Sequence, residues 1–367
     1  MNRCPACGAT YQANAKFCPS DGARLVDAPL RKPEPVTPEE DRATALAKRP
    51  RVEEQQTPEL APGERVDGRY LVERKLGEGG MSFVYLVRDI ATGERYALKV
   101  LSVALSSDHK AMARLRREAS FGMRLAHPNI CHILRLGETA SRLVYVVMPY
   151  IDGEVLSDRV YHRGQLPLDE VRRHVTDVAA GLHAAHRLRI VHRDLKPENV
   201  MVCQRADGSE YAVVMDFGLA KERRAEAELQ KLTVTGIVLG TPEFMSPEQI
   251  RGRPLDGRSD VYSLAVMAFE LLTGKLPFVG RSAQEIMVAR LRGQPLTLRD
   301  ARPDLAFTAG VERVIRRGLA PEPQDRYRTA PEFAEALAGA DDAPLPADEG
   351  WLGRLWGRVR NEGADRT

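Results

Sequence analysis

The spacing of apolar residues changes once along this chain, near Gly153, and this change restricts the possible folds most strongly. Before it, β-branched and aromatic residues form short runs separated by glycines, which predicts strands. After it, apolar residues recur every three or four positions, which places them on one face of a helix. The first such set is Leu168, Val171, Val175, Val178, Leu182 and Ala185. We therefore expect an α+β fold, in which a small strand-rich lobe precedes a larger helical lobe and a ligand binds between them.

The same patterns give the individual elements. Strands are predicted over residues 70–76, 82–88, 96–101 and 143–148, and a helix over 108–125 interrupts them. Further helices are predicted over residues 259–273, 283–291, 309–319 and 331–337. All of these elements fall within one folded domain, which we expect over residues 67–339.

The segments outside this domain differ from it in composition. Residues 27–66 are rich in proline and charge, so we expect a linker with little structure. Residues 340–367 include aromatic and basic side chains, and two glycines favour a mobile tail over one that rests on an anionic membrane or a partner. Residues 1–26 hold three of the five cysteines while Cys131 and Cys203 stand alone, which does not indicate a disulfide framework.

Charge and hydropathy argue against several other classes of protein. The chain has 54 Lys and Arg against 51 Asp and Glu, and this net charge of +3 gives no reason to expect a nucleic-acid partner. No apolar run approaches the roughly 18 to 20 residues of a membrane span, and the first residues lack the apolar core of a signal peptide. We therefore expect a cytoplasmic protein.

A glycine-rich segment, LGEGGMSFV at residues 76–84, lies between two predicted strands. Its glycines would let backbone N–H groups of a hairpin approach phosphate oxygens. Glycine turns between strands are common, so a purely structural turn remains an alternative for this segment taken alone. A nicotinamide or flavin site would need a helix after the glycines, whereas residues 82–88 are predicted to be a strand.

Lys99 lies within an otherwise apolar predicted strand, YALKVL at residues 96–101. A buried ammonium needs a partner, and Glu118 in the following predicted helix is the candidate. The paired lysine would then hold nucleotide phosphates. The alternative is that Lys99 extends its ammonium to the surface.

Two further runs carry the chemistry: VHRDLKPENV at residues 191–200 and MDFGLA at residues 215–220. With them, the sequence over residues 70–339 resembles the eukaryotic-type protein kinases, and their bacterial serine/threonine branch in particular. The resemblance implies the bilobal kinase fold and ATP-dependent phosphoryl transfer to Ser/Thr hydroxyls of proteins. The implied cofactors are ATP and Mg²⁺.

The resemblance also assigns roles to individual residues. Asp194 would be the catalytic base, and Lys196 would steady the transferred phosphoryl group. Asn199 and Asp216 would hold Mg²⁺ through oxygen atoms. The implied nucleotide-binding residues are Leu76, Gly77, Gly79, Gly80, Val84, Ala97, Lys99, Met148, Pro149, Ile151, Asn199 and Asp216.

Two positions depart from the family pattern. Ser82 replaces the third glycine of the nucleotide loop, but three glycines remain. Pro149 in the hinge between the lobes lacks an N–H donor. By the resemblance, adenine would use the carbonyl of Pro149 and the N–H of Ile151, and proline removes neither.

Residues 240–248 resemble the end of the family's activation loop, where Glu248 would pair with Arg326. Asp260 would brace the catalytic loop from the helix beneath it. Arg193 resembles the arginine that binds a phosphorylated activation loop, so we expect autophosphorylation at Thr233 or Thr235. A second role, contact with the catalytic loop, is expected for Thr241.

The cysteines of the N-terminal segment resemble the two knuckles of a small zinc ribbon. A tetrahedral Zn²⁺ site would consist of Cys4, Cys7, Cys18 and Asp21, because zinc accepts carboxylate oxygen as well as thiolate. The alternatives are a fourth ligand from elsewhere or no metal. A segment this short has almost no core, so a metal would be needed to fold it.

The sequence leaves two alternative functions. A small-molecule phosphotransferase would have a related fold, but the segment from Thr241 to Glu248 favours a protein substrate. A pseudokinase scaffold would bind partners without turning over ATP, and such proteins usually lack the lysine, the base or a magnesium position. Lys99, Asp194 and Asp216 are all present here.

Overall fold

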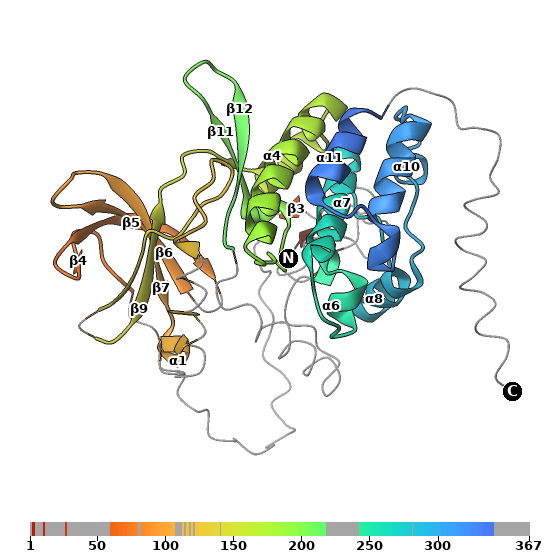
Figure 1. Ribbon diagram of the computed structural model, residues 1–367. Coiled ribbons are helices and arrows are strands. Elements are labelled where there is room, and N and C mark those ends of the chain that lie inside the picture. Colours follow the sequence, from red (N-terminus) through yellow and green to blue (C-terminus); the bar gives the residue numbers. More distant parts are fainter. Residues whose placement is uncertain are drawn as a thin grey trace, which may run out of the picture.

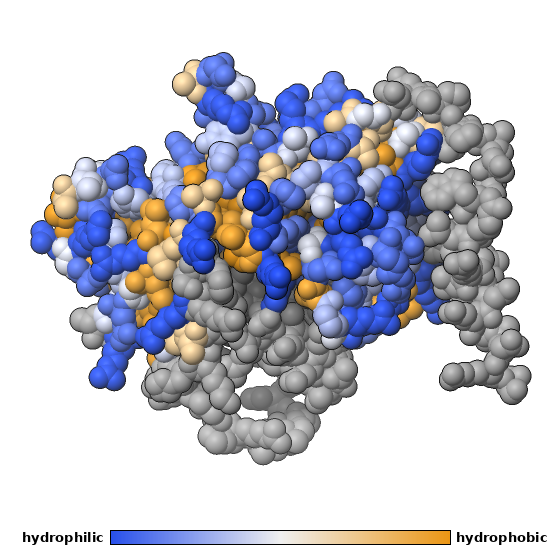
Figure 2. All heavy atoms as spheres, viewed as in Figure 1, coloured by the Kyte–Doolittle hydropathy of each residue, from blue (hydrophilic) through white to orange (hydrophobic). Residues whose placement is uncertain are grey.

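The structure is a computed structural model with two lobes (Figure 1). It describes residues 2–3, 10–11, 26–27, 59–79, 82–106, 112–113, 115–116, 119, 122–139, 141–217, 242–280 and 282–340. A strand-rich lobe and a helical lobe follow one another along the chain, as the change in apolar spacing predicted. Polar residues cover most of the face in Figure 2, and hydrophobic residues gather where the two lobes meet.

The strand-rich lobe is an antiparallel sheet of six strands in the order β4-β5-β6-β7-β9-β8. The strands are β4 (Arg65–Val66), β5 (Tyr70–Gly79), β6 (Ser82–Asp89), β7 (Arg95–Leu101), β8 (Arg135–Glu138) and β9 (Val144–Pro149). β5 extends beyond its predicted end because its glycines continue the ladder, with Gly77 opposite Val84 and Gly79 opposite Ser82. The glycine-rich segment is therefore the tip of a β-hairpin.

Residues that precede the predicted start of the domain also belong to this lobe. Val66 in β4 is buried, and Leu60 packs partly against the sheet core while its N–H donates to the Tyr85 hydroxyl at 3.1 Å. Half of the helix predicted over residues 108–125 falls outside the described residues, and its predicted end is wrong because residues 123–125 are turn and irregular backbone. Of its described residues, Met112 and Leu115 are helical and buried.

The helical lobe is built around α7 (Gly257–Thr273), in which every residue from Ser259 to Thr273 is buried. The other helices are α3 (Leu156–Arg163), α4 (Leu168–Arg187), α6 (Pro247–Ile250), α8 (Ala283–Arg292), α9 (Leu298–Ala301), α10 (Ala309–Gly318) and α11 (Ala330–Ala338). In Figure 1, α4, α10 and α11 lie around α7, and each of them contacts it. A helix buried on all sides is expected at the centre of a core.

Side-chain caps fix where these helices begin. Asp256, Ser282, Thr308 and Thr329 each accept a backbone N–H from the first turn of the helix that follows. α7 ends at Gly274, whose φ of 69° is a left-handed conformation that glycine adopts without strain. These local signals explain why the helices predicted over residues 259–273, 283–291, 309–319 and 331–337 lie close to their observed positions.

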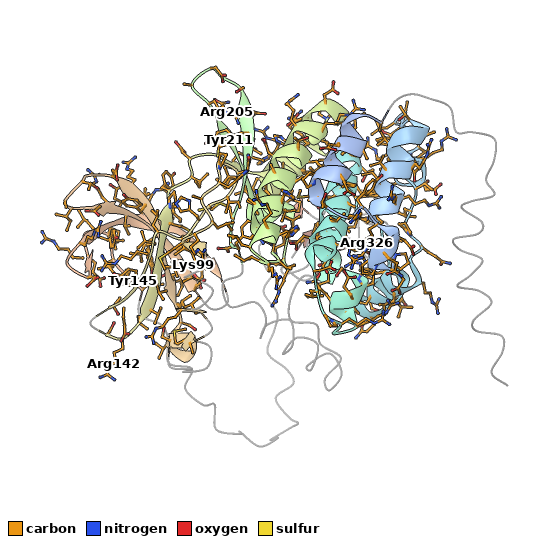
Figure 3. The ribbon with its side chains drawn as sticks, viewed as in Figure 1. Lys99, Arg142, Tyr145, Arg205, Tyr211 and Arg326 are labelled. Atoms are coloured by element: carbon orange, nitrogen blue, oxygen red, sulfur yellow. The ribbon has the colours of Figure 1, made fainter. Side chains whose placement is uncertain are left out.

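A small sheet connects the two lobes. It consists of β10 (Glu154–Val155), β11 (Val200–Gln204) and β12 (Glu210–Val214), none of which was predicted because the three strands are short. Beyond the hairpin turn, Val214 donates its N–H to the Asn129 carbonyl and accepts the Cys131 N–H, both at 2.9 Å. Arg205 and Tyr211 stack on this hairpin (Figure 3). The segment that follows β12 is thereby held beside the strand-rich lobe.

Three two-residue strands, β1 (Asn2–Arg3), β2 (Thr10–Tyr11) and β3 (Val26–Asp27), form a separate sheet with β1 in the middle. The predicted zinc ligands between them lie outside the described residues, as do residues 341–367 of the predicted tail. No helix in the described part of the chain has the length and hydrophobicity needed to cross a membrane.

The pairing of Glu248 with Arg326 is confirmed, and it lies deep in the helical lobe (Figure 3). Two hydrogen bonds of 2.7 Å join the guanidinium to the two carboxylate oxygens. Ser259 donates a third bond to Glu248, and Arg326 also binds backbone carbonyls such as that of Ala320. Burial alone would raise the pKa of Glu248, but the bonds and charge of Arg326 bring it below its usual value.

We expect Arg326→Ala to destabilise the domain by about 3–5 kcal/mol, because it leaves the Glu248 carboxylate buried without its cation. The control is Arg253→Ala, which removes an exposed ion pair with Glu322 and should cost about 1 kcal/mol or less. Urea unfolding followed by circular dichroism measures both. Equal stability of the two variants would contradict the structural role of the buried pair.

Candidate active site

The structure brings Lys99 of β7, which is labelled in Figure 3, to Asp216 in the segment that follows β12. The Lys99 Nζ lies 2.8 Å from one carboxylate oxygen of Asp216 and 2.9 Å from the other. Only 15% of the lysine side chain is exposed, so the ammonium is paired in the interior and does not extend to the surface. The predicted partner, Glu118, lies outside the described residues.

The predicted catalytic loop, residues 191–200, places Asp194, Lys196 and Asn199 next to one another. The Asn199 amide donates to the Asp194 carbonyl at 2.6 Å and to its carboxylate at 3.1 Å. The Lys196 Nζ lies 3.8 Å from the same carboxylate. A 3₁₀ turn, Pro197–Asn199, fixes Asn199, whose carbonyl accepts the Met215 N–H at 2.8 Å. This last bond links the loop to the segment that carries Asp216.

The backbone of the site is strained at two positions. Arg193 and Asp216 have φ values of 67° and 56°, in the left-handed region that side chains disfavour. Each such residue costs on the order of 1–3 kcal/mol and persists only where its surroundings impose it. At Arg193 the surroundings are Gln249, which donates to its carbonyl at 2.7 Å, and Asp260, which accepts its N–H at 3.0 Å.

Asp260, in the first turn of α7, holds the catalytic loop as predicted. Its carboxylate accepts the N–H of His192 at 2.8 Å as well as that of Arg193, and the His186 ring nitrogen lies 2.7 Å away. Burial favours the neutral acid, but the hydrogen bond with His186 and the charges of His186 and His192 lower the pKa of Asp260 below its usual value. An ionised acceptor therefore holds the loop at neutral pH.

Phe217 packs beneath the loop, next to the His192 ring. Their ring centroids are 4.7 Å apart in an edge-on arrangement, and Phe217 belongs to the core of the helical lobe. The His192 ring nitrogen also lies 2.9 Å from the Met215 carbonyl. Residues on both sides of Asp216 are thus held by the helical lobe, while Asp216 itself faces Lys99.

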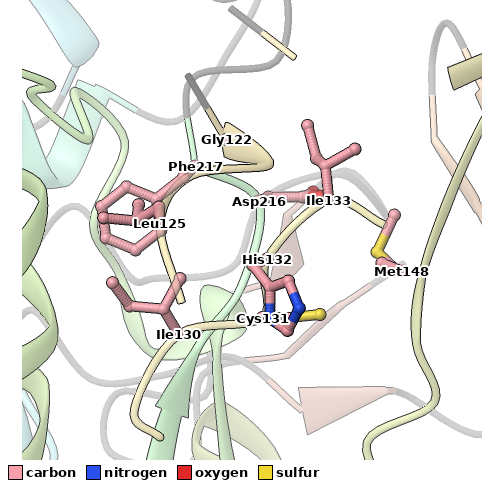
Figure 4. A pocket seen from close by; sticks show the side chains of 9 residues that line it. All are labelled: Gly122, Leu125, Ile130, Cys131, His132, Ile133, Met148, Asp216 and Phe217. Carbon is pink, nitrogen blue, oxygen red and sulfur yellow. The ribbon is translucent and has the colours of Figure 1, made fainter. Parts of the chain in front are cut away.

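Asp216 and Phe217 line a small cavity of about 10 Å³ (Figure 4). This is roughly the space that one water molecule needs. Cys131 and Met148 form part of its wall. Burial raises the pKa of the Cys131 thiol to about 12, so this thiol stays protonated and is a poor nucleophile.

Five of the predicted nucleotide-binding residues form one apolar cluster beside Lys99. They are Leu76, Val84, Ala97, Met148 and Ile151. They come from β5, β6, β7, β9 and the segment after β9, and an apolar wall of this kind suits a flat aromatic base. Gly77 and Gly79 belong to β5, the strand that also carries Leu76. The carbonyl of Pro149 lies 3.8 Å from the Cys131 sulfur. Gly80 lies outside the described residues.

A second cluster of possible metal ligands lies between α4 and β12. The ligand atoms of Glu170, His174 and Glu210 lie within 4.8 Å of one another. Arg159 occupies the cluster, with bonds of 2.8–2.9 Å to Glu210 and 3.1 Å to Glu170, and Arg163 also binds Glu170. Guanidinium groups therefore already neutralise these carboxylates, which indicates a structural ion-pair network.

Several residues that support the site were not predicted from the sequence. Gln249 contacts the predicted catalytic loop directly, and His186 supports it through Asp260. The buried Arg290 donates to the carbonyls of Glu243 and Met245. Each partner is distant in the chain, so a single sequence carries no local signal for these contacts.

A family model described as "Protein kinase domain" matches residues 70–336. The chain is similar to the serine/threonine-protein kinase pkn3 of Myxococcus xanthus, with 38% identity over 76% of this chain and 51% of pkn3. It is similar to the serine/threonine-protein kinase PrkC of Bacillus subtilis, with 35% identity over 77% of this chain and 42% of PrkC. The chain thus spans about half or less of these relatives.

Among solved structures, the chain is similar to the PknI kinase domain of Mycobacterium tuberculosis. The identity is 33% and the TM-score is 0.61, and the match covers 77% of this chain and all of that domain. The same two lobes are therefore present in an experimentally determined relative.

Proposed function

The chain belongs to the protein kinase family, and we propose that it transfers the γ-phosphoryl group of ATP to serine and threonine hydroxyls of proteins. The observation that carries this proposal is the convergence of two pairs, Lys99 with Asp216 and Asn199 with Asp194. The hydrogen bond between Met215 and Asn199 joins the two pairs into one site. The site at the boundary between the lobes thus contains one ammonium, one amide and two carboxylates.

Each of these groups has a place in the proposed transfer. Asp194 accepts the proton of the attacking hydroxyl, and Lys196, 3.8 Å away, stabilises charge on the phosphoryl group. Lys99 binds phosphate oxygens of ATP, while the apolar cluster that includes Ala97 and Met148 receives the base.

Asn199 and Asp216 fit a bound Mg²⁺. The Asn199 amide nitrogen donates to Asp194, which turns the amide oxygen to the other side as an acceptor. Asp216 offers carboxylate oxygens from a side chain that is 30% exposed. Both are the hard oxygen ligands that Mg²⁺ prefers. When bound, the ion would bridge and neutralise the phosphates of ATP.

The segment that resembles the end of the activation loop supports a protein substrate over a small molecule. Ser246 caps α6 and forms a capping box with Gln249, and Gln249 reaches the Arg193 carbonyl. Glu248 anchors the same segment on Arg326. The proposed platform for a polypeptide is thus fixed to the catalytic loop.

We expect Asp194→Asn to lower the rate of phosphoryl transfer by about 10²–10⁴-fold, because it removes the proton acceptor. The measurement is transfer of labelled phosphate from ATP to a generic protein substrate at saturating ATP. The matched control is Asp207→Asn, in the exposed β11–β12 turn, where Asp207 bonds only to Ser209 among the described residues. Equal rates for the native chain and Asp194→Asn would refute the assignment of the base.

We propose that Thr233 or Thr235, both outside the described residues, becomes autophosphorylated and binds Arg193. The strained backbone of Arg193 is fixed by Gln249 and Asp260, which supports a preformed place for its guanidinium. We expect mass mapping of the active enzyme to find phosphate at one of the two threonines. Phosphate should be absent from protein carrying Asp194→Asn. Active enzyme that is unmodified at both positions would contradict this proposal.

We also propose that Cys4, Cys7, Cys18 and Asp21 bind Zn²⁺. Pairing of Arg3 with Thr10 and of Arg3 with Val26 brings together the strands that flank the ligand-bearing segments, which supports a common site. Metal analysis of purified protein should give one zinc per chain. Cys18→Ser should lose this zinc, whereas the control Cys203→Ala, at a buried thiol of the kinase domain, should retain it. A folded N-terminal segment without zinc would disprove the site.

A further inference from the structure

A second cavity, larger and open to solvent, lies in the helical lobe, where the last turn of α4 meets the first turns of α7 and α11. Its volume is about 340 Å³, within the range of small-molecule sites. None of Lys99, Asp194 and Asp216 lines it, so it is separate from the candidate active site. The titratable side chains that line it are His183, His186, Arg187, Asp256, Arg258 and Arg328.

The charge of this cavity is positive. Asp256 is the one carboxylate in its wall, and the Arg258 guanidinium neutralises it with contacts of 2.6–3.1 Å. Arg187 and Arg328 are exposed, and no carboxylate within the described ranges lies within 4.0 Å of either guanidinium. Two guanidinium charges therefore remain available to a ligand.

The N-termini of two helices add to the positive potential of the cavity. α7 begins at Gly257 and α11 at Ala330, and their N-cap residues, Asp256 and Thr329, both line the cavity. Helix N-termini carry partial positive charge and favour anions. Arginine binds phosphate with two parallel hydrogen bonds, so a dianionic phosphate matches the two available guanidinium groups better than a carboxylate does.

The cavity also touches the support of the catalytic loop. One ring nitrogen of His186 lies 2.7 Å from Asp260, the residue that holds the N–H groups of His192 and Arg193. The other ring nitrogen faces Gly257, where a Cβ would lie only 2.6 Å from it. The His186 ring thus lies between the cavity and the Asp260 carboxylate, which positions the loop before Asp194.

We propose that this cavity binds a phosphate-bearing small molecule through Arg187 and Arg328, and that its occupant changes the rate of catalysis through His186 and Asp260. A ligand that shifts the His186 ring shifts the carboxylate bonded to it, and Asp260 carries two hydrogen bonds of the catalytic loop. His186 is a positioning residue in this scheme, since its printed hydrogen bond is to Asp260, which would not touch ATP.

The binding test uses phenyl phosphate as the probe and calorimetry on the full chain. The double variant Arg187→Gln with Arg328→Gln should weaken binding by about tenfold or more, because it removes both available charges. The matched control, Arg292→Gln with Arg299→Gln, makes the same charge change at exposed positions of α8 and α9 and should bind as the native chain does. Equal losses in both double variants, or no binding to the native chain, would overturn the proposed site.

The kinetic test rests on the proposed kinase activity. Phenyl phosphate should change the rate of phosphoryl transfer at saturating ATP by about fivefold or more in the native chain and the control, and leave the Arg187→Gln, Arg328→Gln variant unaffected. Binding without any change in rate would overturn the effect on catalysis. If the native chain transfers no phosphate, the proposed function fails, and the calorimetry still decides whether the cavity binds phosphate.

Discussion

The site depends first on the Asp260 carboxylate, which is buried in α7 and accepts the backbone N–H groups of His192 and Arg193. These bonds hold Arg193 in a left-handed conformation that it would not adopt alone. Because α7 is buried from Ser259 to Thr273, Asp260 anchors the loop that carries Asp194 to the helical core. The core of the helical lobe therefore sets the backbone conformation next to Asp194.

The strand-rich lobe contributes the other half of the site. Lys99 projects from the central part of the sheet and meets Asp216 from a segment 117 residues further along the chain. The hairpin β11–β12 makes this meeting possible, because it bonds to Asn129 and Cys131 and holds its own continuation beside the sheet. Family membership, the apolar cluster that includes Ala97, and the polar convergence all indicate the same chemistry.

Agreement between sequence and structure varies with the length of the element and the range of the contact. Helices of 9 and 17 residues, α11 and α7, were predicted well, because apolar spacing and capping residues define them locally. Strands of two to five residues, such as β10 and β12, carry too few residues to show a period. The partner of Lys99 was sought at Glu118, and the described contact is with Asp216.

The sequence alone determined the order of the two lobes and the grouping of Asp194, Lys196 and Asn199, because these residues share one short loop and have few ways to separate. It also predicted the Glu248–Arg326 pair and the role of Asp260 through family resemblance. Three features follow from the packing of the helices and have no signal in the sequence. His186 supports Asp260, Gln249 bonds to the predicted catalytic loop, and a basic cavity opens beside His186. Such contacts join side chains from separate helices, and only packing of the core brings those helices together.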